Sequence, residues 1–212
     1  ETFAQKIIIP GFVEAHAHVM AGGMMLHPYL GYFQRARGDG SIAPGIKSYA
    51  ALIAALQDEH QNIADPAEPL VAVGFDPIYF NDQPRLSCHH LDQVSTTRPI
   101  FIYHASGHLA TVNTAMLVAN GVTKALAVDG LGRDAAGELD GELREPPAMS
   151  LCRTGYSIVQ RANTTEAAML EFAALARNAG VTTCTDLGGV SLLAPKSLAL
   201  WRKVTGDTSY PV

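Results

Sequence analysis

The stretch that decides the fold runs Pro10-Gly11-Phe12-Val13-Glu14-Ala15-His16-Ala17-His18. Three consecutive isoleucines precede it, the proline-glycine pair interrupts the apolar run, and the apolar residues then continue up to His16. This pattern is typical of a turn that leads into a buried strand. We therefore predict a buried strand over residues 12–18, with two histidines at its end.

The two histidines are separated by one residue. Because side chains alternate between the two faces of a strand, the imidazoles of His16 and His18 are expected to project from the same side. Two neighbouring imidazoles can share one divalent ion such as zinc, which leaves further positions for carboxylates and water. The alternative is that they are two unrelated polar residues near a strand end. The spacing makes His16 and His18 the first candidates for metal ligands.

The segment after this strand is predicted to change from loop to regular structure. Residues 20–45 are rich in glycine and methionine and irregular in apolar spacing, which is typical of an extended loop or insertion. From Ser48 the apolar residues recur at helical spacing, which predicts a helix that ends before Pro66. Two short apolar runs, residues 70–75 and 100–103, are expected to be buried strands.

The second half of the chain continues with helices and a strand. Asn113 is placed to cap a short helix, and residues 130–141 form a glycine- and acid-rich region that predicts a turn. Asn163 stands three residues before Glu166, the spacing of a capping box. We expect a helix from there to Gly180. A strand over residues 181–185 and a helix over residues 191–204 are expected to follow.

Alternating strands and helices favour an α/β fold with a parallel sheet. A complete eight-stranded α/β barrel needs about 250 residues. The expected fold is therefore a partial (β/α)8 TIM-type barrel, its first half, with a large insertion after the first strand. Within one domain over residues 1–212, residues 1–19 hold the first strand, 20–150 the insertion and loops with short strands, and 151–212 the βα units. We expect truncation at both ends, with residues 210–212 opening another strand.

Composition narrows the class of partner. The 212 residues are 48% hydrophobic and 17% charged, as in a soluble globular chain with one sizeable core. A net charge of −5 with scattered basic residues favours a small-molecule substrate, with no nucleic acid and no membrane as partner. Three separated cysteines indicate no disulfide framework and fit a cytoplasmic location. Because half a barrel exposes strand edges, a stable piece is expected either to self-associate as a homo-oligomer or to close in another way than a barrel.

The opening string resembles the signature of the amidohydrolase superfamily, in which a proline-glycine turn leads into the first barrel strand and both histidines bind metal. Glu14 stands where aspartate is more usual, and Phe75 where tryptophan is common. Further segments occur in the order seen in the amidohydrolase 3 family, in the branch similar to N-substituted formamide deformylase: Gly74-Phe75-Asp76, Leu91-Asp92, Arg98-Pro99-Ile100, Ser106-Gly107-His108, Asn113-Thr114-Ala115 and Gly141-Glu142-Leu143.

Three further residues are candidates for the site. His108 follows a predicted strand and could reach a substrate carbonyl or carboxylate, or alternatively structure its loop. Glu145 matches a family glutamate that could supply a carboxylate to the metal centre or the substrate, with a solvated loop charge as the rival. Asp76 could line the substrate pocket, although an aspartate before a proline is also an ordinary turn residue. We assign His108 and Asp76 to substrate binding and Glu145 to the metal.

The other polar residues receive weaker assignments. Asp186 ends a predicted strand, where it could lie at the catalytic rim, or it could serve a capping or loop role. His104 and the adjacent His89 and His90 are expected to be non-catalytic.

The resemblance implies hydrolysis of an amide-like C–N bond through a metal-activated water, with one or two divalent ions, zinc being the expected metal. In the family, two more histidines on middle strands and an aspartate on the last strand complete the site. These lie beyond Val212, so no catalytic acid or base is assigned and the piece itself is expected to be inactive. The alternatives are a non-catalytic metal- or ligand-binding module and an inactive structural fragment.

Overall fold

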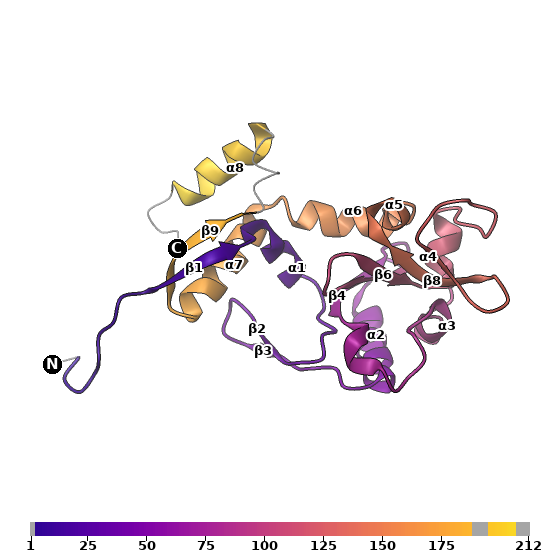
Figure 1. The fold of residues 1–212 in the computed structure, drawn as a ribbon, viewed down its shortest axis with the longest axis horizontal. Coiled ribbons are helices and arrows are strands. Elements are labelled where there is room, and N and C mark those ends of the chain that lie inside the picture. The colour runs from indigo at the N-terminus through magenta and orange to yellow at the C-terminus, as the bar shows by residue number, and fades with distance from the viewer. Residues whose placement is uncertain (1–2, 188–194, 207–212) are drawn as a thin grey trace. The chain divides into compact units, whose positions relative to one another are not determined.

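The computed structural model describes residues 3–187 and 195–206. It is a mixed α/β structure that divides into two compact units (Figure 1). Unit 1 comprises Glu1–Gly23, Ala36–Ser41 and Asn163–Val212, and unit 2 comprises Met24–Arg35 and Ile42–Ala162. This confirms the predicted α/β class, whereas closure into a barrel and the division of residues 1–212 into one domain stay predictions.

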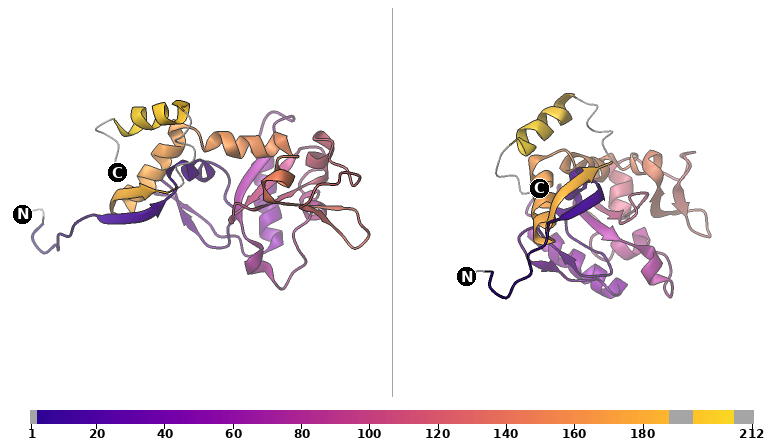
Figure 2. Two further views of the ribbon diagram at one scale, coloured as in Figure 1. Left: turned by 45° about the horizontal axis from the view of Figure 1, so that its top comes forward. Right: turned by 60° about the vertical axis from the view of Figure 1, so that its left-hand side comes forward.

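Unit 1 is built on a parallel pair of strands, β1 (Phe12–Ala17) and β9 (Val181–Asp186). The two strands lie side by side in both views of Figure 2. The helix α7 (Glu166–Asn178) precedes β9, and a short 3-10 helix, η1 (Val19–Ala21), follows β1. Val19, Met169 and Val204 of α8 (Pro195–Thr205) form the small apolar core of this unit.

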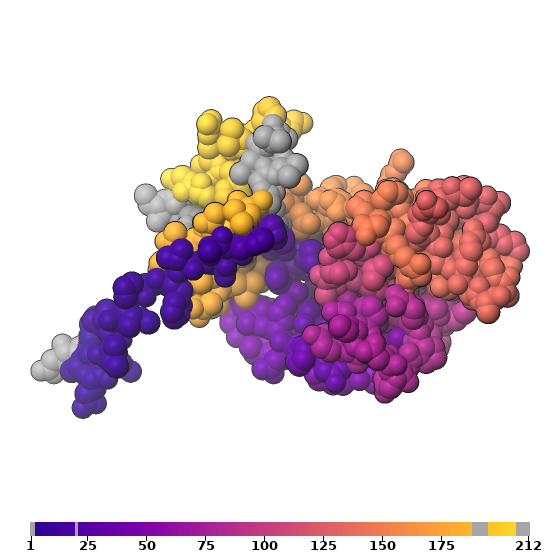
Figure 3. Space-filling view, viewed as in Figure 1, coloured from indigo at the N-terminus to yellow at the C-terminus, as the bar shows by residue number. Residues whose placement is uncertain are grey.

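Strand β1 is exposed, although the sequence predicts a buried strand. Five of its six residues are exposed to solvent, and Ile7 before it is 91% exposed. Figure 3 shows this N-terminal segment standing clear at the surface. Among the described residues β1 pairs with β9 alone, and the small core of unit 1 covers little of it. The predicted burial was therefore wrong for the chain by itself.

Unit 2 contains a five-stranded sheet in the order β4-β5-β6-β8-β7. Its strands are β4 (Leu70–Phe75), β5 (Ile100–His104), β6 (Leu109–Val112), β8 (Leu139–Arg144) and β7 (Leu131–Arg133). Strands β4 and β5 are parallel, as predicted, but the remaining neighbours are antiparallel. The prediction of a turn over residues 130–141 is confirmed in part, because the turn occupies residues 134–138 between β7 and β8, and the residues on either side belong to these strands.

Both faces of this sheet are buried. Ala72, Ile100 and Ile102 pack in the cluster that also contains Leu52 and Leu56 of α2 (Tyr49–Asn62). Their neighbours along the strands pack on the other face, against α4 (Thr114–Ala119), α5 (Glu145–Met149) and α6 (Arg153–Ala162). Alternating burial on two faces explains why these strands are continuous apolar runs in the sequence.

Several short elements lie between the longer helices and strands along the chain. The loop predicted over residues 20–45 contains α1 (Gly22–Met25) and the paired strands β2 (Arg35–Ala36) and β3 (Ile42–Ala43). The 3-10 helix η2 (Pro77–Phe80) and the helix α3 (Cys88–Leu91) lie between β4 and β5 in sequence. No helix in residues 3–187 or 195–206 is both long and apolar enough to cross a membrane.

The residues that cap the helices can be compared with the helix starts that the sequence suggests. Ser48 caps α2, and Asn113 caps α4 by accepting a hydrogen bond from the backbone N–H of Met116 at 3.0 Å. Asn163 does not cap α7, because Thr165 stands directly before the first helical residue and accepts from Ala168 N at 3.2 Å. The expected start of the last helix at 191 and the strand expected at 210–212 lie outside the described residues.

Candidate functional site

The structure brings the two histidines of the opening stretch together. The Nε2 atoms of His16 and His18 are 3.3 Å apart, and the rings meet edge to face with centroids 5.0 Å apart. The His18 side chain is 56% exposed, so the paired nitrogens are accessible from solvent. Both imidazoles therefore present a nitrogen to the same point in space, as the spacing predicts.

The position of His16 is set by an irregularity in the pairing of β1 with β9. Glu14 pairs with Cys184 and Ala17 pairs with Asp186, so β1 uses one more residue than β9 over the same length. A bulge of this kind re-aims a side chain and is common beside active sites. The Glu14 carboxylate accepts a hydrogen bond from the backbone N–H of His16 at 3.0 Å, which holds the bulged segment in place.

Asp186 lies beside His18. Its Oδ2 accepts a hydrogen bond from Val19 N at 2.9 Å, and its Oδ1 is 3.9 Å from His18 Nδ1. The second distance is too long for a direct hydrogen bond. A carboxylate on the Nδ1 side still favours the tautomer with its proton on Nδ1, which leaves the lone pair of Nε2 facing His16. The structure thus places Asp186 at the end of β9, next to His18.

The nitrogen pair suits a tetrahedral metal. Zinc binds imidazole nitrogens at about 2.0–2.1 Å, and tetrahedral angles then separate two such ligands by about 3.3–3.4 Å. The separation of 3.3 Å between His16 Nε2 and His18 Nε2 fits one edge of that tetrahedron. No group of three or more His, Cys, Asp or Glu suited to a metal occurs within the part of the chain that the structure describes. The pair therefore has a spacing that two ligands of one tetrahedral metal ion could have.

His108 and Glu145 form a second pair, in unit 2. His108 Nδ1 lies 2.9 Å from Glu145 Oε2, and Glu145 N donates to His108 O at 2.8 Å. Both side chains are more than half exposed. Glu145 has a φ of 64°, a conformation that residues other than glycine rarely adopt and that is frequent at functional sites. The structure brings together two candidates that the sequence places 37 positions apart.

Asp76 ends β4 and serves as a turn residue. Its Oδ1 accepts a hydrogen bond from Ile78 N at 3.1 Å, which caps η2. This is the alternative that the residue before a proline suggests. The contact uses one carboxylate oxygen, so the assignment to substrate binding stays a prediction.

Sequence reasoning missed a buried carboxylate in unit 2 that pairs with two exposed arginines. Glu142 is 3% exposed, and its carboxylate accepts hydrogen bonds from Arg85 Nε at 2.7 Å and Arg144 Nε at 2.6 Å. Burial raises the pKa of Glu142, but the two arginines outweigh burial and the pKa is lowered. Glu142 is part of the Gly141-Glu142-Leu143 segment, yet nothing in the sequence shows that Arg85 lies opposite it.

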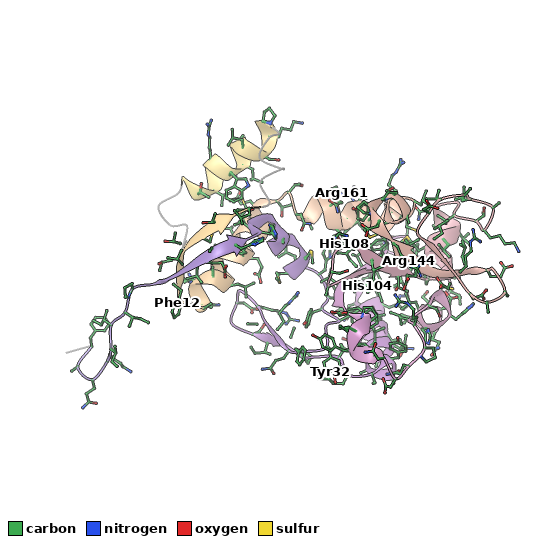
Figure 4. All side chains as sticks on the ribbon, viewed as in Figure 1. Phe12, Tyr32, His104, His108, Arg144 and Arg161 are labelled. Carbon is green, nitrogen blue, oxygen red and sulfur yellow. The ribbon has the colours of Figure 1, made fainter. Side chains whose placement is uncertain are left out.

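His104 lies close to the carboxylate of Glu142. Its side chain is buried, its Nε2 lies 2.9 Å from Thr111 Oγ1, and burial lowers its pKa to about 4. Figure 4 labels His104, His108 and Arg144 on the strands and loops of unit 2. A neutral histidine of this kind suits a structural role, in keeping with its predicted lack of catalytic function.

His89 and His90 lie on α3 instead of a strand. His90 Nδ1 accepts a hydrogen bond from Ser87 N at 3.1 Å and lies 2.9 Å from Ser87 Oγ. These contacts stabilise the start of the helix and give His90 a structural role.

Two solved structures resemble the fold. An uncharacterized metal-dependent hydrolase from Pyrococcus horikoshii OT3 is 16% identical with a TM-score of 0.54, and the match covers 96% of this chain and 35% of that chain. An uncharacterized metal-dependent hydrolase from Pyrococcus furiosus is 18% identical with a TM-score of 0.49, and the match covers 92% of this chain and 34% of that chain. The chain thus spans about a third of the length of these structures.

No curated protein matches the chain. The model of the amidohydrolase family matches residues 4–212. This match runs through both units and includes the histidine pair, Asp186 and the His108–Glu145 pair. The chain therefore belongs to the amidohydrolase family.

Proposed function

We propose that the chain contributes His16 and His18 to the divalent-metal site of a hydrolase that cleaves an amide-like C–N bond with an activated water. The observation that carries this proposal is the 3.3 Å separation of the two Nε2 atoms, which fits one edge of a tetrahedral metal site. Family membership supports the same assignment. Zinc is the preferred ion in the proposal, because imidazole nitrogens suit it.

Each residue of the site has a proposed task. His16 and His18 hold the metal, Glu14 fixes the backbone of His16, and Asp186 orients His18 from its Nδ1 side. A divalent ion held by these residues supplies Lewis acidity, which polarises a carbonyl and makes water a better nucleophile near neutral pH.

His108 and Glu145 of unit 2 also have proposed tasks. In this proposal Glu145 adds a carboxylate to the metal site and His108 contacts the substrate carbonyl or carboxylate. Their contact at 2.9 Å aligns the ring of His108 and fixes which of its nitrogens carries a proton, since a carboxylate can only accept. In its imidazolium form, His108 donates from Nδ1 to Glu145 and from Nε2 to the substrate oxygen. Asp76 is proposed to contact the substrate.

The protein is proposed to belong to the branch that resembles N-substituted formamide deformylase. Within residues 3–187 and 195–206, no three or more His, Cys, Asp or Glu side chains are grouped to hold a metal. This favours weak metal binding without turnover for the chain alone. A metal-binding module without catalysis is therefore the second candidate for the chain.

Metal titration of the purified chain tests the proposal. The cobalt(II) absorption spectrum and calorimetry with zinc should both show binding, and His16→Ala or His18→Ala should weaken it at least about tenfold through loss of one ligand. His89→Ala removes an exposed histidine of unit 2 and serves as the matched control. Equal affinity of the wild type, both variants and the control would remove the pair from the metal site.

A second assay separates catalysis from binding. The complete gene product should hydrolyse N-acyl or formamide compounds, and His16→Ala should abolish that activity while leaving the far-ultraviolet circular dichroism spectrum unchanged. Metal binding without hydrolysis of any such compound would favour the metal-binding module.

A further inference from the structure

A lysine lies in the corner between two aromatic rings in unit 2. Lys47 Nζ is 3.6 Å from the centroid of the Tyr32 ring and 4.7 Å from that of Phe33. The two rings are 5.2 Å apart at an interplanar angle of 76°, so they form two nearly perpendicular walls. Both distances are well inside the about 6 Å over which a ring face attracts a cation. We call Tyr32 and Phe33 the aromatic corner; Tyr32 is labelled in Figure 4.

Two further aromatic side chains contact the rings of the aromatic corner. Tyr79 stacks on Tyr32 with centroids 4.9 Å apart and meets Phe33 edge to face at 5.1 Å. The buried Phe80 contacts Tyr32 edge to face at 5.8 Å. The rings are therefore held by one another and by η2, independently of Lys47.

Backbone contacts fix the segment that carries the corner. Leu30 N donates to Val73 O at 2.8 Å, which ties the segment to β4, and Ile46 N donates to Gly31 O at 2.8 Å. A Cβ on Gly45 would lie 2.3 Å from Tyr32 O, so the two backbones are in close contact. A site built in this way is preorganised, which lowers the entropic cost of binding a ligand.

Lys47 itself is weakly held. It is exposed, and within residues 3–187 and 195–206 its ammonium has ring faces as partners but no ion pair and no hydrogen bond. An ammonium with three donors gains more from oxygen acceptors than from rings. The aromatic corner therefore attracts a cation through its ring faces, but ring faces are weaker partners for a primary ammonium than oxygen acceptors are.

We propose that the aromatic corner binds the quaternary ammonium group of a small molecule, with Lys47 occupying the place until the ligand displaces it. A trimethylammonium group has a spread charge, apolar methyl groups and no hydrogen-bond donor, which matches two ring faces. Recognition of quaternary ammonium ligands is an established use of such rings. Phe33 is 56% exposed, so the corner is open to solvent. The proposal does not depend on the proposed hydrolase function, because it is tested by the binding of a quaternary ammonium ion and not by catalysis.

Titration of the chain with tetramethylammonium chloride, followed by NMR of the aromatic ring protons, tests the proposal. Binding should be saturable, and Lys47→Ala should bind about two- to fivefold more tightly, since the competing cation is gone. Neopentyl alcohol, a neutral compound of similar shape, should cause no saturable shift at the same concentrations, and sodium chloride controls for ionic strength.

A ring variant locates the binding. Lys47→Ala combined with Phe33→Leu should lose most of the affinity, whereas combination with Phe3→Leu, an exposed phenylalanine of unit 1, should not change it. Circular dichroism checks that the variants are folded. Equal response to neopentyl alcohol, absence of saturation in Lys47→Ala, or unchanged affinity without Phe33 would each overturn the proposal.

Discussion

His104 shows at the scale of one residue how burial sets a charge state. The imidazole is 1% exposed, its Nε2 bonds with Thr111, and its Nδ1 has no partner among the residues that the structure describes. The ring of Phe75 meets it edge to face at 5.0 Å. Burial lowers the pKa of His104 to about 4, with the nearby Glu142 raising it and Arg85 lowering it. The neutral imidazole is therefore the native form.

This burial predicts a pH-dependent stability. Because the pKa of His104 is about 4 when folded and about 6.5 when unfolded, the unfolded chain takes up the proton first. The contribution to stability is fully present above pH 6.5 and is lost as pH falls toward 4. Between pH 7 and 5 the free energy of unfolding should fall by about 2 kcal/mol more in the wild type than in His104→Gln.

Urea denaturation at the two pH values measures this difference. His89→Gln removes an exposed histidine and should keep the wild-type slope. Since both variants retain His27 and His90, whose pKa values burial also lowers, the comparison isolates His104. Identical slopes for the wild type and His104→Gln would contradict the interpretation.

Residues close in sequence were the ones that could be predicted at this scale. His16 and His18 are two positions apart, so the period of a strand predicts that their side chains project from the same side. Glu142 and Arg85 are 57 positions apart, and their contact depends on the folding of the whole sheet. The bulge that places His16 also depends on β9, which the sequence of β1 does not reveal.

At the scale of elements, close packing joins α6 to β5. A Cβ on Gly155 would lie 2.5 Å from Phe101 Cβ, and Phe101 is fully buried. Alanine usually stabilises a helix relative to glycine by about 1 kcal/mol. Here the added methyl group has no space, because the backbone of α6 lies directly on the aromatic ring.

Gly155→Ala is therefore expected to destabilise the chain by about 1–3 kcal/mol, the usual cost of overpacking a core. The midpoint of urea denaturation measures the change. Gln160→Ala, at an exposed position of the same helix, should shift stability by less than about 0.5 kcal/mol. A more stable Gly155→Ala would show that the helix can move away from β5.

Helices whose start is marked by a local residue pattern were predicted well, whereas the pairing of the strands was not. Ser48 and Asn113 cap the helices that follow them, because a cap acts on its own backbone. The hairpin between β5 and β6 was missed, since residues 105–108 form a short turn in which Gly107 has a φ of 75°. Alternation of strands and helices favours parallel pairing, but that turn leaves room only for an antiparallel return.

The whole molecule consists of two units with separate cores. Both faces of the sheet in unit 2 are covered by its own helices, whereas unit 1 has a small core. Unit 2 thus has what an independently folding domain needs. The exposed Phe12 and Val13 of unit 1 favour the predicted self-association, which stays a prediction.

A shortened chain of residues 24–162 tests this independence. It contains all of unit 2 together with the short Ala36–Ser41 segment. It should unfold in one cooperative thermal transition and give a dispersed NMR spectrum. Non-cooperative melting together with strong binding of a hydrophobic dye would show that unit 2 needs the remaining residues.

The hydrogen bond between Val19 and Asp186 links residues 167 positions apart. During translation the two imidazoles therefore leave the ribosome long before the carboxylate that lies beside them, and before the strand that shapes their bulge. A metal ion that binds the nascent chain at that stage would contact the histidines before Asp186 and β9 are in place. Under the proposed function, metal binding in the native geometry is accordingly expected only after β9 has docked on β1.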